Sequence, residues 1–164
     1  SPALRASALS ERLGFWASRL LGVDRVRLYQ DALFLKRPGD GPTEWHSDLR
    51  LTPFDTNGFV TIWLALTPVP AEGGTGLSFA KRSHKDFAVA LFGDPDTGLD
   101  GRYEVAEPAD LMPGDATFHH GWTLHSADEM LPDTPGPRLA WAVSFVEDGA
   151  TLRRVAGLDM VEDA

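Results

Sequence analysis

Most apolar residues of the chain occur in short runs that are typical of β-strands. The segment 58–69 (GFVTIWLALTPV) is apolar at nearly every position and rich in β-branched and aromatic residues, which predicts a strand covered on both faces. The segment 138–147 (RLAWAVSFVE) predicts another strand, and 116–127 (ATFHHGWTLHSA) predicts one or two. Shorter strands are expected at residues 77–80 and 102–107.

A helical period occurs at the N-terminus. Four large apolar side chains recur there at the spacing of one helical face: Leu9, Leu13, Trp16 and Leu20. Ser1-Pro2 is a typical helix start, and Gly22 is a typical stop. The pattern predicts one helix over roughly residues 3–21, within an N-terminal segment 1–22.

The segment 26–36 (VRLYQDALFLK) predicts a strand whose even-numbered residues share one face. Most of these residues are apolar, so that face is expected to be buried. Gln30 and Lys36 are its polar exceptions, and a buried amide or ammonium needs a partner. Either Lys36 lies at the strand end and extends its ammonium to water, or Gln30 and Lys36 both line a polar cavity.

Turn signals separate these elements. Gly- and Pro-rich stretches at 37–48, 71–76 and 131–137 predict loops, and 84–92 is expected to form a helical turn or a loop. Neither a strand–helix–strand alternation nor a Gly-rich phosphate loop occurs, which argues against a Rossmann-type sheet. We therefore expect residues 1–164 to form a single mainly β domain, a sandwich or jelly roll with a flanking N-terminal helix.

The composition limits the classes of partner and cofactor that the protein could bind. The formal net charge of −9 disfavours nucleic acid and anionic membranes, and no apolar run is long enough to cross a bilayer. The N-terminus lacks the apolar core of a signal peptide, so a cytoplasmic location is expected. The chain contains no Cys, which excludes disulfides and iron–sulfur clusters and leaves His and carboxylates to hold any metal.

The pattern His-x-Asp occurs twice among the five His of the chain, at residues 46–48 and 84–86. On a strand, residues i and i+2 point to the same face, so His46 and Asp48 could bind one ion. A third ligand must come from elsewhere, and His125 lies in a predicted strand. Two His and one carboxylate on one side of an ion form the facial arrangement of non-haem Fe(II) oxygenases. The helical His-Glu-x-x-His pattern of zinc hydrolases is absent.

Three other His compete with this set. His119 has the same strand parity as His125 and is the nearest rival for the third ligand, while His84 belongs to the second His-x-Asp. A structural role, or support of the metal ligands, is the favoured interpretation for His119 and His120.

Four segments occur in an order that resembles one known family: FLKRPGDGPTEWHSD, TIWLALTPVPAEGGTGLSFAKRSHK, PGDATFHHGWTLHSA and RLAWAVSFVEDG. Together they look like the phytanoyl-CoA dioxygenase family of Fe(II)- and 2-oxoglutarate-dependent oxygenases. The resemblance covers roughly residues 26–148 and implies a double-stranded β-helix, a cupin-like jelly roll with iron near its mouth.

The resemblance also assigns roles. It implies that iron is held by His46, Asp48 and His125 and that Arg138 grips the distal carboxylate of 2-oxoglutarate. Three further residues fall where the family often lines the co-substrate pocket: Gln30, Lys36 and Trp63. Ala127 departs from the family, which often has Ser two places after the distal His; here Ser126 lies one place short.

The function that this resemblance implies is hydroxylation of an aliphatic C–H bond of a small-molecule substrate by O2, with release of succinate and CO2. One alternative is a jelly-roll module that binds metal or small molecules without catalysis. Another is a cupin-like metal enzyme that needs no co-substrate, in which Arg138 would be dispensable.

Overall fold

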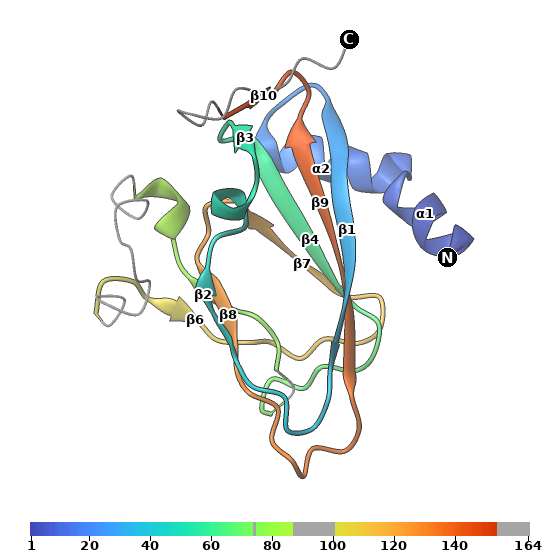
Figure 1. Cartoon of the computed structure of the whole chain (residues 1–164), viewed down its shortest axis with the longest axis vertical. Helices are drawn as coiled ribbons and strands as arrows, with labels where there is room; N and C mark the ends of the chain where they lie inside the picture. Colours follow the sequence, from blue (N-terminus) through green and yellow to red (C-terminus); the bar gives the residue numbers. More distant parts are fainter. Residues whose placement is uncertain (74, 87–100, 154–164) are drawn as a thin grey trace.

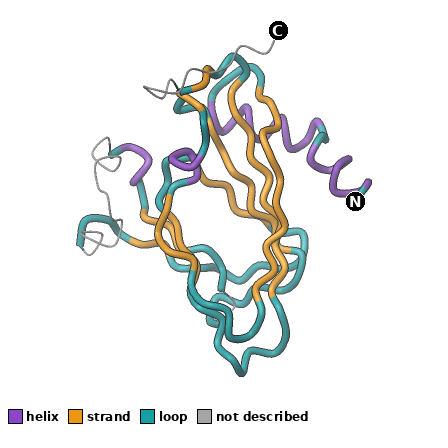
Figure 2. The backbone as a smooth tube through the Cα atoms, in the orientation of Figure 1, coloured by secondary structure: helices purple, strands orange, loops and turns teal. Residues whose placement is uncertain are grey.

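The computed structural model describes residues 1–73, 75–86 and 101–153. Within these ranges the chain forms two four-stranded antiparallel sheets, a small two-stranded pair and two N-terminal helices. The helices lie on the side of the larger sheet that faces away from the smaller sheet (Figures 1 and 2). This layered, mainly β arrangement is the expected jelly roll.

The larger sheet has the strand order β1-β9-β4-β7. Its strands are β1 (Val26–Lys36), β9 (Arg138–Glu147), β4 (Phe59–Ala65) and β7 (Ala116–His120). As predicted, β4 is covered on both faces, since six of its seven residues are buried. β4 lies between β9 and β7, and every strand contact in this sheet is antiparallel.

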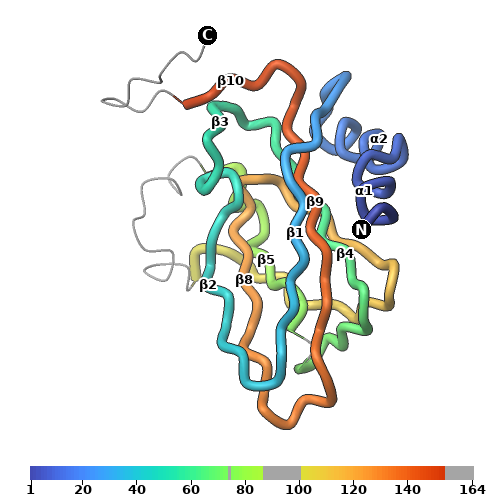
Figure 3. Tube along the Cα trace, turned by 45° about the vertical axis from the view of Figure 1, so that its right-hand side comes forward, coloured from blue at the N-terminus to red at the C-terminus, as the bar shows by residue number. Residues whose placement is uncertain are grey.

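The smaller sheet has the order β2-β8-β5-β6. Its strands are β2 (Thr43–His46), β8 (His125–Ala127), β5 (Ser78–Ala80) and β6 (Val105–Ala106), and a separate pair joins β3 (Phe54–Asp55) to β10 (Thr151–Leu152). Figure 3 shows β2 and β8 side by side, in front of β5 and apart from the long strands. Two short 3-10 helices complete the described chain: η1 (Asp48–Leu51) and η2 (Ser83–Lys85). Residues 87–92 of the segment expected to form a turn or loop lie outside the described residues.

The single N-terminal helix that the sequence predicts is in fact two helices, α1 (Pro2–Ala8) and α2 (Glu11–Leu21). The break lies at Ser10, whose extended backbone and side-chain oxygen cap α2 by accepting a hydrogen bond from the Leu13 amide at 3.4 Å. Gly22 ends α2 in the left-handed conformation (φ 70°), as predicted. Most of the predicted apolar face is exposed, because α2 instead packs on the sheet through Ala17, a small side chain that allows close approach.

The prediction of one continuous face along 26–36 is wrong for a similar local reason. The pairing of β1 with β9 shifts between Leu28 and Gln30, so Tyr29 is an extra residue that forms a β-bulge. A bulge reverses the side-chain alternation. Leu28 therefore packs with the helix-facing core, whereas Gln30 faces the opposite side, toward the smaller sheet.

The two faces of the larger sheet consequently differ. The helix-facing side carries the main apolar core, which includes Val60, Ile62, Val143 and Phe145 with Ala17 of α2. The opposite side carries polar residues in the same strands. None of the described helices is long and apolar enough to cross a membrane.

Candidate metal and co-substrate site

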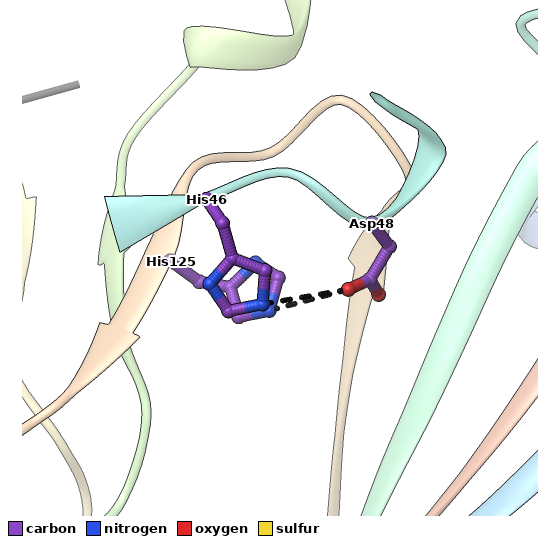
Figure 4. A group of neighbouring side chains, drawn as sticks. All are labelled: His46, Asp48 and His125. Atoms are coloured by element: carbon purple, nitrogen blue, oxygen red, sulfur yellow. Dashed lines mark ion pairs between the residues drawn. The ribbon is translucent and has the colours of Figure 1, made fainter. Parts of the chain in front are cut away.

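The three residues of the predicted ligand set come from different elements and converge (Figure 4). His46 is the last residue of β2, His125 is the first residue of β8, and the two are register partners. Asp48 is the first residue of η1, so it does not share a strand with His46 as expected. The chain turns at Ser47 instead, and one ligand atom from each of the three residues lies within 4.8 Å of the others.

The separations at this point suit a shared ion better than hydrogen bonds. The Oδ1 atom of Asp48 lies 3.7 Å from Nε2 of His46 and 3.6 Å from Nε2 of His125. Both distances exceed the usual range of hydrogen bonds, roughly 2.7–3.2 Å. They are slightly wider than the roughly 3.0–3.4 Å expected between two neighbouring ligands that each lie about 2.1 Å from one ion.

Both imidazoles are oriented by the backbone. Nδ1 of His46 lies 2.8 Å from the Glu44 carbonyl oxygen, and Nδ1 of His125 lies 3.0 Å from that of Thr123. A carbonyl only accepts, so each Nδ1 carries the proton and each Nε2 presents its lone pair to the common point. Two imidazole lone pairs and a carboxylate oxygen are a donor set that fits Fe(II).

The electrostatics keep these groups in their metal-binding protonation states. Burial lowers the pKa of His125 to about 3, and the neighbouring imidazoles of His119 and His46 add to this effect, so the His125 ring is neutral at pH 7. Burial alone would raise the pKa of Asp48, but hydrogen bonds from His119 and Thr61 and the nearby imidazoles lower it well below its usual range. Asp48 is therefore ionised, and no proton has to leave either group before a metal binds.

A close backbone contact fixes η1 beneath the strands. The Gly121 carbonyl accepts from the Leu49 amide at 2.9 Å, and the Gly121 amide donates to the Phe59 carbonyl at 2.7 Å. A Cβ atom at position 121 would lie 2.9 Å from side-chain carbons of both Leu49 and Phe59. Only glycine allows this approach, which sets the position of the neighbouring Asp48.

The three residues lie on the wall of a cavity of about 120 Å³ between the two sheets. Its lining residues come from β1, β2, η1, β4, β7, β8 and β9 and from the loop before β5: Gln30, Ala32, Phe34, Thr43, His46, Asp48, Thr61, Trp63, Leu77, His119, His125, Ala127, Arg138, Ala142 and Ser144. The space is smaller than the roughly 300–1,000 Å³ of sites for drug-sized ligands. It suits a compact molecule such as a short dicarboxylic acid.

Arg138 is the cation of this cavity. Its side chain is 5% exposed, its Nε donates to Oγ1 of Thr75 at 3.2 Å, and its guanidinium carbon lies 5.1 Å from the centre of the Trp63 ring. Burial lowers its pKa to about 10, so the guanidinium is charged at neutral pH. Since Thr75 takes up Nε, the terminal nitrogens keep donors for a carboxylate.

Of the three further residues expected to line the co-substrate pocket, Gln30 and Trp63 line the cavity and Lys36 does not. Lys36 pairs with Arg138 in the β1–β9 register, but its side chain is buried and its ammonium donates to the backbone carbonyl of Asp128. Neither sequence interpretation of Lys36 describes this arrangement. Burial, together with the charge of Arg138, lowers its pKa.

The remaining His take other positions. His119 lies on β7, not on the strand of His125, and its Nε2 is 3.0 Å from Oδ2 of Asp48. His120 faces away from the cavity, and its ring lies 5.3 Å from that of His84. Asp86 accepts hydrogen bonds from Arg102 and Tyr103 instead of joining His84 around an ion.

Sequence reasoning missed several polar residues of this site. Thr61 and Ser144 lie within apolar strands, and Thr75 lies in the loop before β5. Their hydroxyls gave no signal along the chain, because their partners are far away in sequence. Ala127 lines the cavity and brings no hydroxyl, as its departure from the family pattern implied.

Comparisons with known proteins agree with this geometry. The sequence profile of the family described as Phytanoyl-CoA dioxygenase matches residues 1–138. No curated protein sequence matches the chain. The non-heme alpha ketoglutarate dependent carbocyclase SnoK from nogalamycin biosynthesis is 28% identical with a TM-score of 0.78, and the match covers 95% of this chain and 64% of SnoK.

Two further solved structures are similar. The epimerase SnoN in complex with Fe3+, alpha ketoglutarate and nogalamycin RO is 29% identical with a TM-score of 0.72, covering 100% of this chain and 66% of SnoN. EctD from S. alaskensis, with 2-oxoglutarate and 5-hydroxyectoine, shares the fold at 20% identity with a TM-score of 0.79, covering 98% of this chain and 57% of EctD. The chain thus spans less than two thirds of the length of these proteins. The profile match over most of its length shows that the chain belongs to the phytanoyl-CoA dioxygenase family.

Proposed function

We propose that this protein is an Fe(II)- and 2-oxoglutarate-dependent oxygenase. The observation that carries the proposal is the convergence of His46, Asp48 and His125 on one wall of a cavity that also contains the buried cation Arg138. Membership of the family and the cofactors named for SnoN support the same conclusion. His46, Asp48 and His125 would hold the metal, which would leave its other coordination positions open to ligands.

Each remaining residue of the cavity has a role in this proposal. Arg138 would bind the distal carboxylate of 2-oxoglutarate through its terminal nitrogens, while Thr75 and the ring of Trp63 hold the guanidinium in place. Gln30 adds an amide to the polar side of the cavity. Iron and 2-oxoglutarate, when bound, would supply the oxidative decarboxylation that yields succinate and CO2 and oxidises a substrate C–H bond.

Hydroxylation of an aliphatic C–H bond of a small molecule by O2 is the first candidate outcome. Epimerisation or ring closure is a second, favoured by one observation: the compared structures above 25% identity are an epimerase and a carbocyclase. All three outcomes use the same metal, co-substrate and cavity. They differ in what happens to the substrate after its C–H bond is oxidised.

We also propose the substrate class, the cellular location and the extent of the domain. The net charge of −9 favours a small-molecule substrate over nucleic acid or a membrane surface. We expect a cytoplasmic location. A single oxygenase domain over residues 1–164 agrees with the profile match, which covers residues 1–138.

Anaerobic addition of Fe(II) and 2-oxoglutarate to the protein tests the assignment. We expect a weak visible charge-transfer band, followed by succinate formation once air is admitted. Metal binding without a band or succinate would instead support a non-catalytic binding module. Succinate formation that survives Arg138→Ala would contradict the role of Arg138. With a substrate in hand, 18O2 separates hydroxylation from the other two outcomes, because only hydroxylation places labelled oxygen in the product made from that substrate.

A further inference from the structure

The two carboxylate oxygens of Asp48 have different surroundings. Oδ1 faces the Nε2 atoms of His46 and His125 without a hydrogen bond to either. Oδ2 lies 3.0 Å from Nε2 of His119 and accepts a hydrogen bond from Oγ1 of Thr61 at 2.5 Å. A carboxylate only accepts, so His119 must donate through Nε2. One oxygen is thus held by two donors, and the other is left for a metal.

These donors belong to one row across the larger sheet. Thr61 of β4 pairs in register with His119 of β7 on one side and with Ser144 of β9 on the other. All three side chains line the cavity, and Oγ of Ser144 lies 3.1 Å from Oγ1 of Thr61. The positions of the donors are therefore set by three paired strands and not by a flexible loop.

Apart from its contact with Asp48, the His119 imidazole makes no hydrogen bond among the residues that the structure describes. The side chain of His119 is 3% exposed, and its Nδ1 has no hydrogen-bond partner among the residues that the structure describes. A buried polar atom without a partner is unfavourable, and an apolar ring of similar size would avoid it. Phe79 and His125 already pack beside this ring, at centroid distances of 5.5 and 4.3 Å. The contact with Asp48 is the one polar interaction that the structure gives the His119 ring.

We propose that His119 and Thr61 are positioning residues that hold Oδ2 of Asp48 away from the metal, so that Asp48 coordinates through Oδ1 alone. This inference rests on the proposed function of the site. A carboxylate that binds through both oxygens takes two coordination positions, and one of them is then lost to the keto-acid end of 2-oxoglutarate. The pair of donors thereby sets both the orientation of Asp48 and the number of positions left open.

Metal affinity provides a test that does not depend on turnover. Co(II) serves as the probe for the ferrous site and is titrated into the metal-free protein by calorimetry. We expect His119→Phe, which keeps a ring but has no donor, to weaken Co(II) binding roughly 10- to 100-fold. His119→Gln can still donate from a similar place and should recover most of the affinity. Thr61→Val removes the second donor with little change in shape and should have a smaller effect than His119→Phe.

Two neighbours serve as matched controls. Thr117 has the same strand parity as His119, and its Oγ1 is buried without a hydrogen-bond partner in the described part of the chain, so Thr117→Val should leave Co(II) affinity unchanged. His120→Phe should also leave it unchanged, because this ring does not line the cavity. Thermal unfolding of each metal-free variant identifies any variant that fails to fold.

The 2-oxoglutarate concentration that the charge-transfer band requires reports how many oxygens of Asp48 coordinate the metal. In the double variant His119→Phe, Thr61→Val at saturating Fe(II), the charge-transfer band should require at least about ten times more 2-oxoglutarate than in the wild type, because Oδ2 competes for a position. An unchanged requirement would overturn the inference, as would wild-type Co(II) affinity in His119→Phe or equal losses in His119→Phe and His119→Gln. If the wild type itself binds no metal, the proposed function fails and the inference fails with it. If the wild type binds Co(II) but substitution of His119 does not change the affinity, only the positioning role of His119 is contradicted.

Discussion

Residues 46–48 and residues 84–86 both read His-x-Asp, yet the structure uses the two tripeptides differently. In the first, the imidazole and the carboxylate face His125, the third proposed ligand, which β8 brings alongside β2. In the second, the imidazole lies against another ring and the carboxylate binds Arg102. The difference lies in the partners that other strands supply, because the local spacing is the same.

The backbone around each tripeptide explains why. The first spans the end of β2 and the start of η1, where the chain turns toward the cavity between the sheets. The second lies in η2 and the residue after it, away from that cavity. A metal site needs donors from several directions, and only the first tripeptide has strands on both sides to supply them.

The largest difference between the two tripeptides is expected when the carboxylate of each is removed. We expect Asp48→Ala to lower both Fe(II) affinity and succinate formation by more than about 100-fold, since it removes a direct ligand. Asp86→Ala, the matched change in the second tripeptide, should leave both within about twofold. Anaerobic metal titration and a succinate assay measure the two quantities. Equal losses in the two variants would show that the first tripeptide has no special role in metal binding.

One arginine in each region gives the next contrast. Arg138→Gln removes the charged fork from the cavity and should raise the KM for 2-oxoglutarate roughly 10- to 100-fold, with Fe(II) affinity unchanged. Arg102→Gln, beside the second tripeptide, should alter neither value. Steady-state kinetics with varied 2-oxoglutarate checks this. A KM that is insensitive to Arg138 would favour a metal enzyme without this co-substrate.

The imidazoles give the smallest contrast, in the pH dependence of stability. Because the pKa of His125 is lowered from 6.5 to about 3, the unfolded chain binds a proton in this interval that the folded chain does not. The metal-free protein should therefore lose stability as the pH falls from 6.5 toward 3, by at most about 1.4 kcal/mol per pH unit from this group. The lowered pKa of Asp48 acts in the same direction, below its ordinary value of 3.8.

Urea unfolding at pH 7, 5.5 and 4.5 measures this slope. His125→Gln should flatten it clearly. His84→Gln should flatten it less, because His84 is only half-buried and burial lowers its pKa to a smaller extent. Slopes that stay the same in both variants would show that His125 does not remain neutral in the folded chain.

The elements that the sequence predicted best are those whose pattern is local. The mostly apolar segments of β4 and β9 identified both strands, since these residues form the buried centre of the larger sheet. The prediction was wrong where one residue changes the phase. Ser10 divides the N-terminal helix, and the bulge at Tyr29 reverses the faces of β1. Neither change alters the apolar content of its segment, so periodicity alone could not detect it.

The candidate site also contains residues that the sequence predicted and one whose role it did not predict. The His-x-Asp tripeptide, His125 and Arg138 could be named from the order of motifs, and the structure brings all four residues to one cavity. The role of His119 could not be predicted, because its bond to Asp48 joins residues 71 positions apart in sequence.

By itself, the sequence determined the mainly β character of the protein, its two central strands and the residue types able to bind iron and a dicarboxylic acid. Hydrophobic period and side-chain chemistry are properties of a few neighbouring residues and can be read along the chain. Only the tertiary structure decided which His-x-Asp acquires a third donor, which oxygen of Asp48 stays free, and that Lys36 binds the Asp128 carbonyl instead of lining the cavity. Strand register and the bulge fix these outcomes, because they determine which distant side chains share a face.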